Sequence, residues 1–315
     1  MLKNKILVTG GAGFIASSLA EKLIKDKKNY VVIVDNLLTG NLKKLPNLPK
    51  NNWQFIKCDV NNYRDIAEVM LSFKFDYVFH YAAVVGVKRT QENPISVLND
   101  INGINNILGL LKNTGVKRVF FSSSSEIYGD PVEIPQNVYT TPLNSRLPYA
   151  IVKNVGEAFI KSYNQEYGFD YTIFRFFNTY GAKQSRDFVI SKFLIKALNN
   201  DDITIYGDGK QTRTFCYIDD NIDACLKALY NKKVVNDVIN VGGSKEISIL
   251  ELAKTIINLT NSKSKIVHLP PLKEGDMKRR KPDNAHMKKL LNKELITLEE
   301  GINRILKEGL FELNN

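Results

Sequence analysis

A tyrosine and a lysine four residues apart could transfer a proton to or from an alcohol. Tyr149 and Lys153 lie in a stretch with helical periodicity, so their side chains share one face of an expected helix. A serine run at 122–125 ends an apolar segment that predicts a buried strand. Ligands bind at this edge of open parallel sheets. Ser, Tyr and Lys together are suited to oxidising an alcohol, although a Tyr–Lys pair at this spacing also occurs by chance on helix surfaces.

A glycine-rich turn near the N-terminus predicts a dinucleotide site. The first expected strand runs into Gly10-Gly11-Ala12-Gly13-Phe14-Ile15-Ala16, where a helix begins. Gly10 permits the tight turn, and Gly13 lets backbone N–H groups approach a pyrophosphate at the helix N-terminus. Ala16 departs from the usual third glycine but is small. A glycine-rich turn without a ligand is the weaker alternative.

Acidic residues at the ends of the second and third expected strands favour NAD. Asp35 can accept hydrogen bonds from both hydroxyls of the adenosine ribose and would repel a 2′-phosphate, and Asn36 after it is not basic. Asp59, which precedes Val60, could either meet the adenine amino group or cap the next helix. The expected cofactor-binding residues are Gly10, Gly13, Phe14, Ile15, Asp35, Asn36, Asp59, Val60, Ala82, Tyr149 and Lys153.

The expected chemistry needs a lowered pKa at Tyr149. A free tyrosine has a pKa of about 10, which makes it a poor base at neutral pH. A lysine ammonium and a positive nicotinamide ring both favour the phenolate, and one charge at ~4 Å contributes ~4 kcal/mol, or about three pKa units. Tyr149 is therefore the expected base, Ser124 is expected to hold the substrate hydroxyl, and Lys153 is expected to hold the nicotinamide ribose.

Strand and helix patterns alternate over the first half of the chain. Strands are expected at 5–9, 31–35, 53–58, 77–80, 118–122 and 171–176, and helices at 15–25, 63–72, 94–112 and 149–167. This alternation predicts an α/β fold with a doubly wound parallel sheet of Rossmann type. A seventh apolar run at 238–242 could return to the sheet. We therefore expect a cofactor domain at 1–177, rejoined at about 215–243, and a smaller interleaved substrate lobe at 178–214 and 244–315.

The chain has 315 residues and a formal charge of +11, which narrows the class of partner. Between residues 263 and 293 there are ten Lys and Arg against three Asp and Glu. Compositional bias and an anionic small-molecule substrate account for this better than nucleic acid, because no nucleic-acid-binding module is visible. The sequence has no apolar run long enough for a membrane helix, no secretion signal and no clustered His and Cys. We expect a cytoplasmic protein without a metal site.

Seven motifs spread over nearly the whole chain carry a resemblance to a known family. They are TGGAGFIA, YAA at 81–83, SSSSEIYG, YAIVK, RFFNTYG at 175–181, DGKQTRTFCYIDD at 208–220 and GDMKRRKPDN at 275–284. Together they resemble the extended short-chain dehydrogenases that modify nucleotide sugars. The middle of the chain is similar to GDP-mannose 4,6-dehydratases, and the later part is similar to UDP-glucuronate decarboxylases and UDP-glucose 4-epimerases. This resemblance implies NAD-dependent oxidation at C4 of a nucleoside-diphosphate sugar, and a homodimer through a four-helix bundle built from 94–112 and 149–167.

The same resemblance implies the substrate-binding residues. Asn178 looks like the asparagine that contacts the nucleotide-sugar. Arg213, Arg279 and Arg280 look like clamps for the pyrophosphate, whose oxygens match the guanidinium fork. Tyr206 is expected to contact the nucleotide base.

Glu126 is the residue that bears most on the final reaction. In the dehydratases an acid here removes the C5 proton, in the decarboxylases it assists loss of CO2, and simple 4-epimerases need none. Departures from the family pattern are Ser125 before Glu126, Asp100 where Asn is usual, and Gly181-Ala182-Lys183-Gln184. A 4-dehydrogenase, a 4,6-dehydratase or a 4-epimerase is expected for surface-polysaccharide synthesis. The alternatives are a decarboxylase, a 4-keto-sugar reductase or a non-catalytic NAD-binding sensor.

Overall fold

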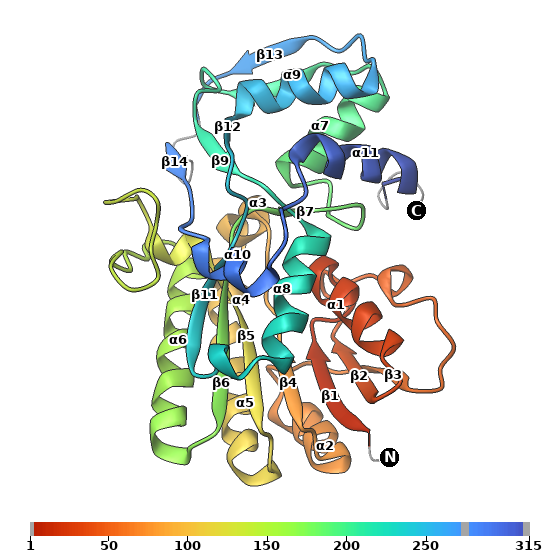
Figure 1. The fold of residues 1–315 in the computed structure, drawn as a ribbon, viewed down its shortest axis with the longest axis vertical. Coiled ribbons are helices and arrows are strands. Elements are labelled where there is room, and N and C mark those ends of the chain that lie inside the picture. The colour runs from red at the N-terminus through yellow and green to blue at the C-terminus, as the bar shows by residue number, and fades with distance from the viewer. Residues whose placement is uncertain (1–2, 272–276, 311–315) are drawn as a thin grey trace.

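Seven parallel strands form the main sheet of the computed structural model, which describes residues 3–271 and 277–310. The strand order is β11-β6-β5-β4-β1-β2-β3 (Figure 1). From β1 the chain winds outward in both directions, which confirms the expected doubly wound Rossmann-type sheet. The strands are β1 Asn4–Thr9, β2 Asn29–Asp35, β3 Trp53–Lys57, β4 Tyr77–His80, β5 Arg118–Ser124, β6 Asp170–Phe176 and β11 Asp237–Val241.

Helices cover both faces of this sheet, because its central strands carry apolar side chains on both faces. Ile6 and Val8 of β1 pack in one core with α1 and α8, whereas Leu7 packs in a second core with α2, α5 and α6. The helices are α1 Phe14–Lys25, α2 Tyr63–Phe73, α5 Asp100–Thr114, α6 Pro148–Tyr167 and α8 Ile218–Tyr230.

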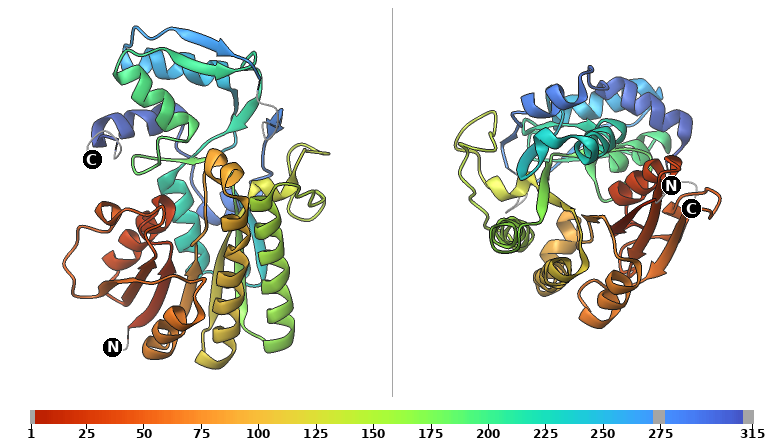
Figure 2. Two further views of the ribbon diagram at one scale, coloured as in Figure 1. Left: turned by 180° about the vertical axis from the view of Figure 1, so that it is seen from behind. Right: turned by 60° about the horizontal axis from the view of Figure 1, so that its bottom comes forward.

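The long helices α5 and α6 lie side by side along one face (Figure 2). Helix α6 begins with Pro148 at its first position and ends at Gly168, which has a left-handed φ of 74°. The single helix expected at 94–112 is wrong: α4 Pro94–Leu98 and α5 are separate and meet at Asn99.

A smaller lobe lies above the carboxyl ends of the main strands (Figure 1). It holds a three-stranded sheet in the order β12-β9-β14 and a parallel pair of β8 with β13. Between segments of this lobe the chain returns to the main sheet through α8 and β11. The remaining elements are α3 Val87–Glu92, α7 Val189–Leu198, α9 Ile249–Thr260, α10 Ala285–Leu291, α11 Leu298–Glu308, β7 Thr179–Tyr180, β8 Ile203–Tyr206, β9 Thr212–Thr214, β10 Cys216–Tyr217, β12 Glu246–Ser248, β13 Ile266–Leu269, β14 Arg279–Arg280 and the 3₁₀ turns η1 Leu42–Lys44, η2 Ser125–Tyr128 and η3 Lys232–Val234.

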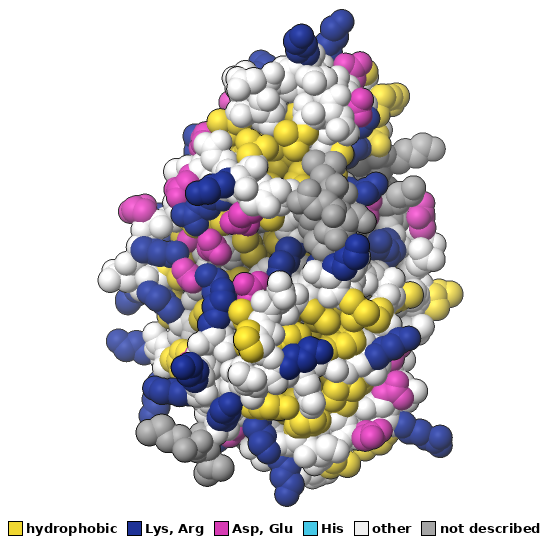
Figure 3. Space-filling model, turned by 90° about the vertical axis from the view of Figure 1, so that its right-hand side faces the viewer, with side chains coloured by type: hydrophobic (Ala, Val, Ile, Leu, Met, Phe, Trp, Pro, Cys, Tyr) yellow, Lys and Arg dark blue, Asp and Glu magenta, His cyan; other side chains and the backbone are white. Residues whose placement is uncertain are grey.

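Positive charge is scattered over the face of the molecule drawn in Figure 3 and is not gathered there into one patch. On the face in Figure 3, Lys and Arg side chains are scattered among hydrophobic and neutral ones, with fewer Asp and Glu. Within 3–271 and 277–310, no helix is both long and apolar enough to span a membrane. In the same part of the chain, no three His, Cys, Asp or Glu side chains are grouped so that they could hold a metal ion.

Candidate active site

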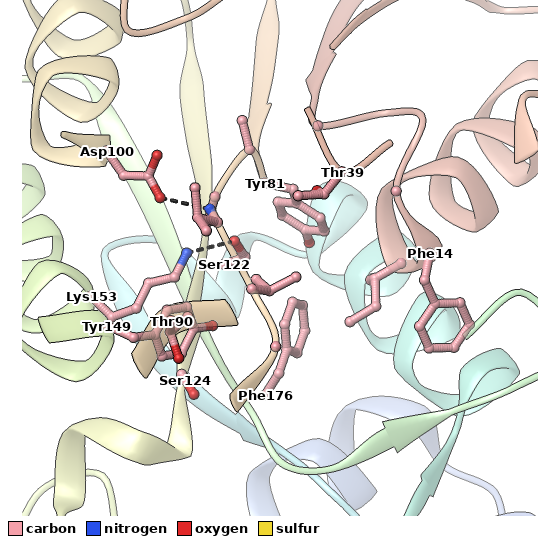
Figure 4. Close-up of a pocket in the computed structure, with 18 of the residues that line it drawn as sticks. Phe14, Thr39, Tyr81, Thr90, Asp100, Ser122, Ser124, Tyr149, Lys153 and Phe176 are labelled. Carbon is pink, nitrogen blue, oxygen red and sulfur yellow. Dashed lines mark hydrogen bonds between the residues drawn. The ribbon is translucent and has the colours of Figure 1, made fainter. Parts of the chain in front are cut away.

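A cavity of about 1180 Å³ lies at the carboxyl edge of the main sheet and extends toward the smaller lobe (Figure 4). Its volume exceeds the 300–1,000 Å³ typical of pockets for one small ligand, so it has room for a dinucleotide and a second molecule. The expected cofactor and catalytic residues all line it: Gly10, Gly13, Phe14, Ile15, Asp35, Asn36, Asp59, Val60, Ala82, Ser124, Glu126, Tyr149 and Lys153.

The turn between β1 and α1 leaves a cradle made of backbone. Gly10 has a φ of +68°, and a Cβ atom there would lie 2.7 Å from the Cα of Ala82. Helix α1 starts after Gly13 with no side-chain cap and no acidic residue in its first turn. A helix N-terminus of this kind favours an anion. These residues therefore fit the pyrophosphate of a dinucleotide.

Asp35 is buried at the end of β2 beside this turn. Its carboxylate accepts hydrogen bonds from the backbone N–H of Ala12 at 3.0 Å and of Leu37 at 2.8 Å. Burial raises the pKa of Asp35, and the two N–H groups lower it. Each oxygen keeps a second lone pair that could accept a ribose hydroxyl. The donor set therefore fits the adenosine half of NAD.

Thr9 and His80, which the sequence analysis did not single out, brace the other wall of the turn. The Thr9 hydroxyl oxygen accepts the backbone N–H groups of Tyr81 and Ala82, both at 3.0 Å. It also lies 3.0 Å from Nδ1 of His80. Burial and the nearby Lys153 charge lower the pKa of His80 to about 3, so the ring is neutral. Thr9 then donates to Nδ1 and holds Ala82 against Gly10. Only the strand pairing of β1 with β4 brings these residues together, so no local pattern could have indicated them.

Tyr149, Ser124 and Lys153 come together where β5 ends against α6 (Figure 4). Lys153 donates from Nζ to Ser122 Oγ at 3.3 Å. Ser124 accepts the backbone N–H of Glu126 at 3.2 Å and hydrogen-bonds to Tyr149. Ser122, which the sequence analysis noted only as part of the serine run, thus fixes the lysine.

The protein's own groups raise the pKa of Tyr149, contrary to the expected lowering. Burial is the main cause, and the Glu126 and Asp100 charges raise it further, whereas the Ser124 hydrogen bond and the Arg280 charge lower it. Burial also lowers the pKa of Lys153 to about 8, which weakens its action as a fixed positive charge. A base at position 149 therefore needs additional positive charge in the cavity.

Asp100 is the carboxylate whose charge acts on the pKa of Lys153. Its carboxylate accepts the backbone N–H of Val84 at 2.7 Å and the Asn61 amide at 3.4 Å. The Asp100 charge raises the pKa of Lys153 against the effect of burial. Burial in turn raises the pKa of Asp100. This carboxylate, the departure from Asn noted above, thus acts directly on the candidate catalytic lysine.

Glu126 forms a buried ion pair with Arg280 of the smaller lobe. Arg280 Nη1 lies 2.7 Å from Glu126 Oε1, and the arginine side chain is only 6% exposed. Arg280 Nε is buried and has no hydrogen-bond partner among the described residues. Both residues line the cavity beside Tyr149. The pair places an acid and a guanidinium in the wall of the cavity.

The other expected substrate residues lie at different places. Asn178 lines the cavity, has a positive φ of 23°, and donates to the carbonyl of Thr214 at 3.1 Å. Arg279 is exposed and pairs with both oxygens of Glu246 at 2.8 Å. Arg213 on β9 and Tyr206 at the end of β8 are not among the cavity-lining residues. Residues 275 and 276 of the last motif lie outside the described part of the chain.

Comparisons with known proteins agree with this geometry. Residues 6–242 match the model of the NAD dependent epimerase/dehydratase family. The chain is 38% identical over 304 residues to a UDP-N-acetyl-alpha-D-glucosaminuronate decarboxylase of Bacillus cytotoxicus, covering 92% of each chain. It superposes with a TM-score of 0.90 and 31% identity on a UDP-glucose 4-epimerase of Thermotoga maritima solved with UDP-glucose, covering 96% of this chain and 97% of the other. It is also similar, with a TM-score of 0.86 and 29% identity, to a UDP-glucuronic acid 4-epimerase of Bacillus cereus solved with UDP-glucuronic acid and NAD, covering 95% and 96%.

Proposed function

The chain belongs to the NAD-dependent epimerase/dehydratase family of enzymes, and from this premise we propose that it oxidises a UDP-hexuronate at C4 and then decarboxylates it. The observation that carries the proposal is the Glu126–Arg280 pair inside the cavity. The Arg280 guanidinium is a cation in the cavity wall, which suits a carboxylate on the reacting sugar. The likeness to a decarboxylase that acts on a hexuronate supports the same substrate class.

In the first step Tyr149 removes the proton of the C4 hydroxyl while Ser124 holds the oxygen. When bound, NAD supplies the acceptor for the C4 hydride, the positive charge that favours the phenolate, and the hydride that reduces C4 at the end of the cycle. Lys153 in its ammonium form adds to that charge and is placed to hold the nicotinamide ribose. The protein keeps the phenol protonated until this positive charge is present, because burial and two carboxylates raise its pKa.

In the second step the carboxylate on C5 is β to the new ketone. The C5–C6 bond breaks, CO2 leaves, and the bonding electron pair enters the C4–C5 enolate. Arg280 would hold the carboxylate before it leaves. Glu126, once its partner binds the substrate and it takes up a proton, can deliver that proton to C5. The described residues of the cavity, together with bound NAD, would therefore supply the groups that decarboxylation needs.

The second candidate function is 4-epimerisation of a UDP-sugar. The structural likeness to the Thermotoga maritima epimerase favours it. In that reaction the keto sugar turns over and C4 is reduced from the other side, so Glu126 would have no proton to transfer.

Incubation of the protein with UDP-glucuronic acid, UDP-N-acetylglucosaminuronic acid, UDP-glucose and UDP-N-acetylglucosamine tests the proposal. Mass spectrometry should show a product lighter by one CO2 from a hexuronate only. Isomerisation without change in mass would favour 4-epimerisation and overturn the decarboxylase. Tyr149→Phe is the control, because it should abolish either reaction.

The remaining expectations form part of the same proposal. Asn178 would contact the nucleotide-sugar, Arg213 would bind its pyrophosphate, and Tyr206 would contact the nucleotide base. The faces of α5 and α6 would pair with those of a second copy, since Ile95 and Leu98 of α4 and Ile151 of α6 are exposed apolar residues beside them. Residues 1–177 with 215–243 would form the cofactor domain, and 178–214 with 244–315 the substrate lobe. A cytoplasmic location stays a prediction.

A further inference from the structure

A row of polar side chains crosses three neighbouring strands directly beneath the candidate catalytic residues. Ser123 of β5 is the register partner of Arg175 on β6, and Arg175 is the register partner of Asn240 on β11. Side chains alternate along β5, so the Ser123 side chain points to the face covered by α6, opposite to those of Ser122 and Ser124, and all three serines line the cavity. The row thus lies one residue away from both serines of the site.

Glu157 joins this row to the helix that carries Tyr149 and Lys153. It lies four residues after Lys153 and eight after Tyr149, on the same side of α6. Its Oε1 accepts the Ser123 hydroxyl at 2.6 Å and Arg175 Nε at 2.9 Å, and its Oε2 accepts Arg175 Nη2 at 2.7 Å. The Glu157 side chain is 1% exposed and that of Arg175 is 3% exposed, so the pair is buried and doubly bonded.

At its other end the row reaches the residue that directly follows Arg280 and strand β14. Arg175 Nη1 donates to the Tyr128 hydroxyl at 2.8 Å, and that hydroxyl donates to Asn240 Oδ1 at 2.8 Å. Asn240 Nδ2 then donates to the Gln136 carbonyl at 2.8 Å. The Gln136 backbone N–H donates to the carbonyl of Lys281, next to Arg280, at 2.8 Å. One chain of hydrogen bonds therefore runs from the catalytic helix to the residue beside the Glu126 partner.

A buried ion pair is weak evidence for stability, because the cost of removing two charges from water often equals or exceeds their attraction. Its directed bonds do, however, fix the positions of the groups that they join. Here those groups are α6, the serine run and the segment next to Arg280. We propose that Glu157 and Arg175 are positioning residues that set Tyr149 and Lys153 against Ser124 and Ser122, and that Tyr128 and Asn240 extend this control to Arg280.

The decisive test replaces the pair by apolar residues of similar size, Glu157→Leu with Arg175→Met. We expect the unfolding midpoint to stay the same or rise, since apolar replacement of a buried pair is often neutral or stabilising. We expect the single-turnover rate of reduction of bound NAD by the UDP-sugar to fall about 100-fold, the typical cost of a displacement of about 1 Å. NAD should also bind several-fold more weakly. A folded double variant with the wild-type rate would overturn the proposal.

Two narrower variants keep the test informative if the double variant does not fold. Ser123→Ala removes only the bond to β5 and should lower the single-turnover rate without changing the KM for the UDP-sugar. Tyr128→Phe removes the link toward Asn240 and should raise that KM with less effect on the rate. Wild-type values for both variants would overturn the proposal, because a pair that only stabilises the fold predicts no change in rate or KM. The matched control, Lys117→Met with Asp76→Asn, removes a surface ion pair of 2.8 Å and should change neither quantity.

The rate measurement rests on the proposed C4 oxidation. Failure of the positioning role can nevertheless be distinguished from failure of that proposed function. Wild-type protein that reduces bound NAD with none of the four UDP-sugars would count against the proposed function. The NAD dissociation constants of the same variants would still test the row. Equal constants for wild type and double variant would then overturn it, and a several-fold difference would support it.

Discussion

The half of the cavity around Gly10 and Asp35 is built largely from backbone, whereas the half around Glu126 and Arg280 is built from side chains 154 residues apart. In the first half a tight turn, a free helix N-terminus and one carboxylate lie within 26 residues of sequence. In the second half the key contact joins η2 to β14 and depends on how the smaller lobe packs against the sheet edge. The cofactor half of the cavity therefore depends on local backbone geometry, while the half expected to act on the sugar depends on long-range pairs.

The largest expected effect is at the meeting point of the two halves. Tyr149→Phe should lower the rate of C4 oxidation by about 100- to 10,000-fold, because it removes the general base. NAD affinity should change little, since the backbone cradle is intact. Stopped-flow absorbance of the reduced nicotinamide measures the first quantity and calorimetry the second. Near-wild-type turnover would show that the proton goes elsewhere.

Substrate binding in the half around Glu126 and Arg280 should depend mainly on the charge of its side chains. Arg280→Ala should raise the KM for a UDP-hexuronate about 10- to 150-fold, the range for a lost hydrogen bond to a charged group. Arg279→Ala is the matched control, because Arg279 is exposed and already paired with Glu246. It should change KM by about twofold, as an exposed pair contributes little. Equal effects of the two variants would argue against a special role for the buried arginine.

NAD binding in the half around Gly10 and Asp35 should instead depend on the shape of the backbone turn. Gly10→Ala should weaken NAD binding about tenfold, because the added Cβ would press on the Ala82 backbone at 2.7 Å and a positive φ is strained for alanine. Gly168→Ala provides the control: its φ is +74°, but nothing lies within 4 Å of the added Cβ. It carries the same φ strain without the clash, so it should lower stability less than Gly10→Ala and leave NAD affinity unchanged. A Gly10→Ala protein with normal affinity would remove the cradle from the binding site.

The smallest expected effect concerns pH. The ammonium form of Lys153 favours the cofactor ribose and its pKa is about 8, so NAD affinity should be constant at lower pH and fall as the pH rises through about 8. Asp100 raises the lysine pKa, so Asp100→Asn should move this fall to lower pH. The other groups beside the pair are Asp59, whose charge raises the pKa of Asp100, His80, which is neutral, and the Tyr149 ring, 5.7 Å from Lys153 Nζ. Fluorescence titrations of NAD against pH measure the midpoint, and Asp76→Asn, far from the cavity, should not shift it. An unchanged midpoint in Asp100→Asn would contradict the charge coupling.

The sequence predicted which residues gather at the backbone half of the cavity, because the signals there are local. Three signals each lie within a few residues of an expected strand or helix: Gly10, Asp35 and the Tyr149–Lys153 spacing. Their joint placement around one cavity follows from the order of strands. The fold class was predictable for the same reason, and the break at Asn99 was missed because apolar periodicity continues across it.

The polar row and the ion pairs could not be predicted from the sequence. Glu157 and Arg175 carry no pattern of their own, and they meet only because β5 and β6 are neighbours and α6 packs across them. The raised pKa of Tyr149 likewise follows from burial between Glu126 and Asp100, which spacing alone does not report. The basic cluster around 263–293 was visible, but its composition could not show that Arg280 is buried and Arg279 exposed.

The position of β11 at the edge of the sheet has a consequence for biosynthesis. Residues 237–241 are made long after the other six strands, and until they emerge from the ribosome β6 is an edge strand with unpaired backbone groups. The nascent chain would then hold Arg175 without Asn240 beside it. A chain that ends before residue 237 should therefore expose an adhesive strand edge next to an incomplete site, and we expect such truncated products to associate or to need a chaperone.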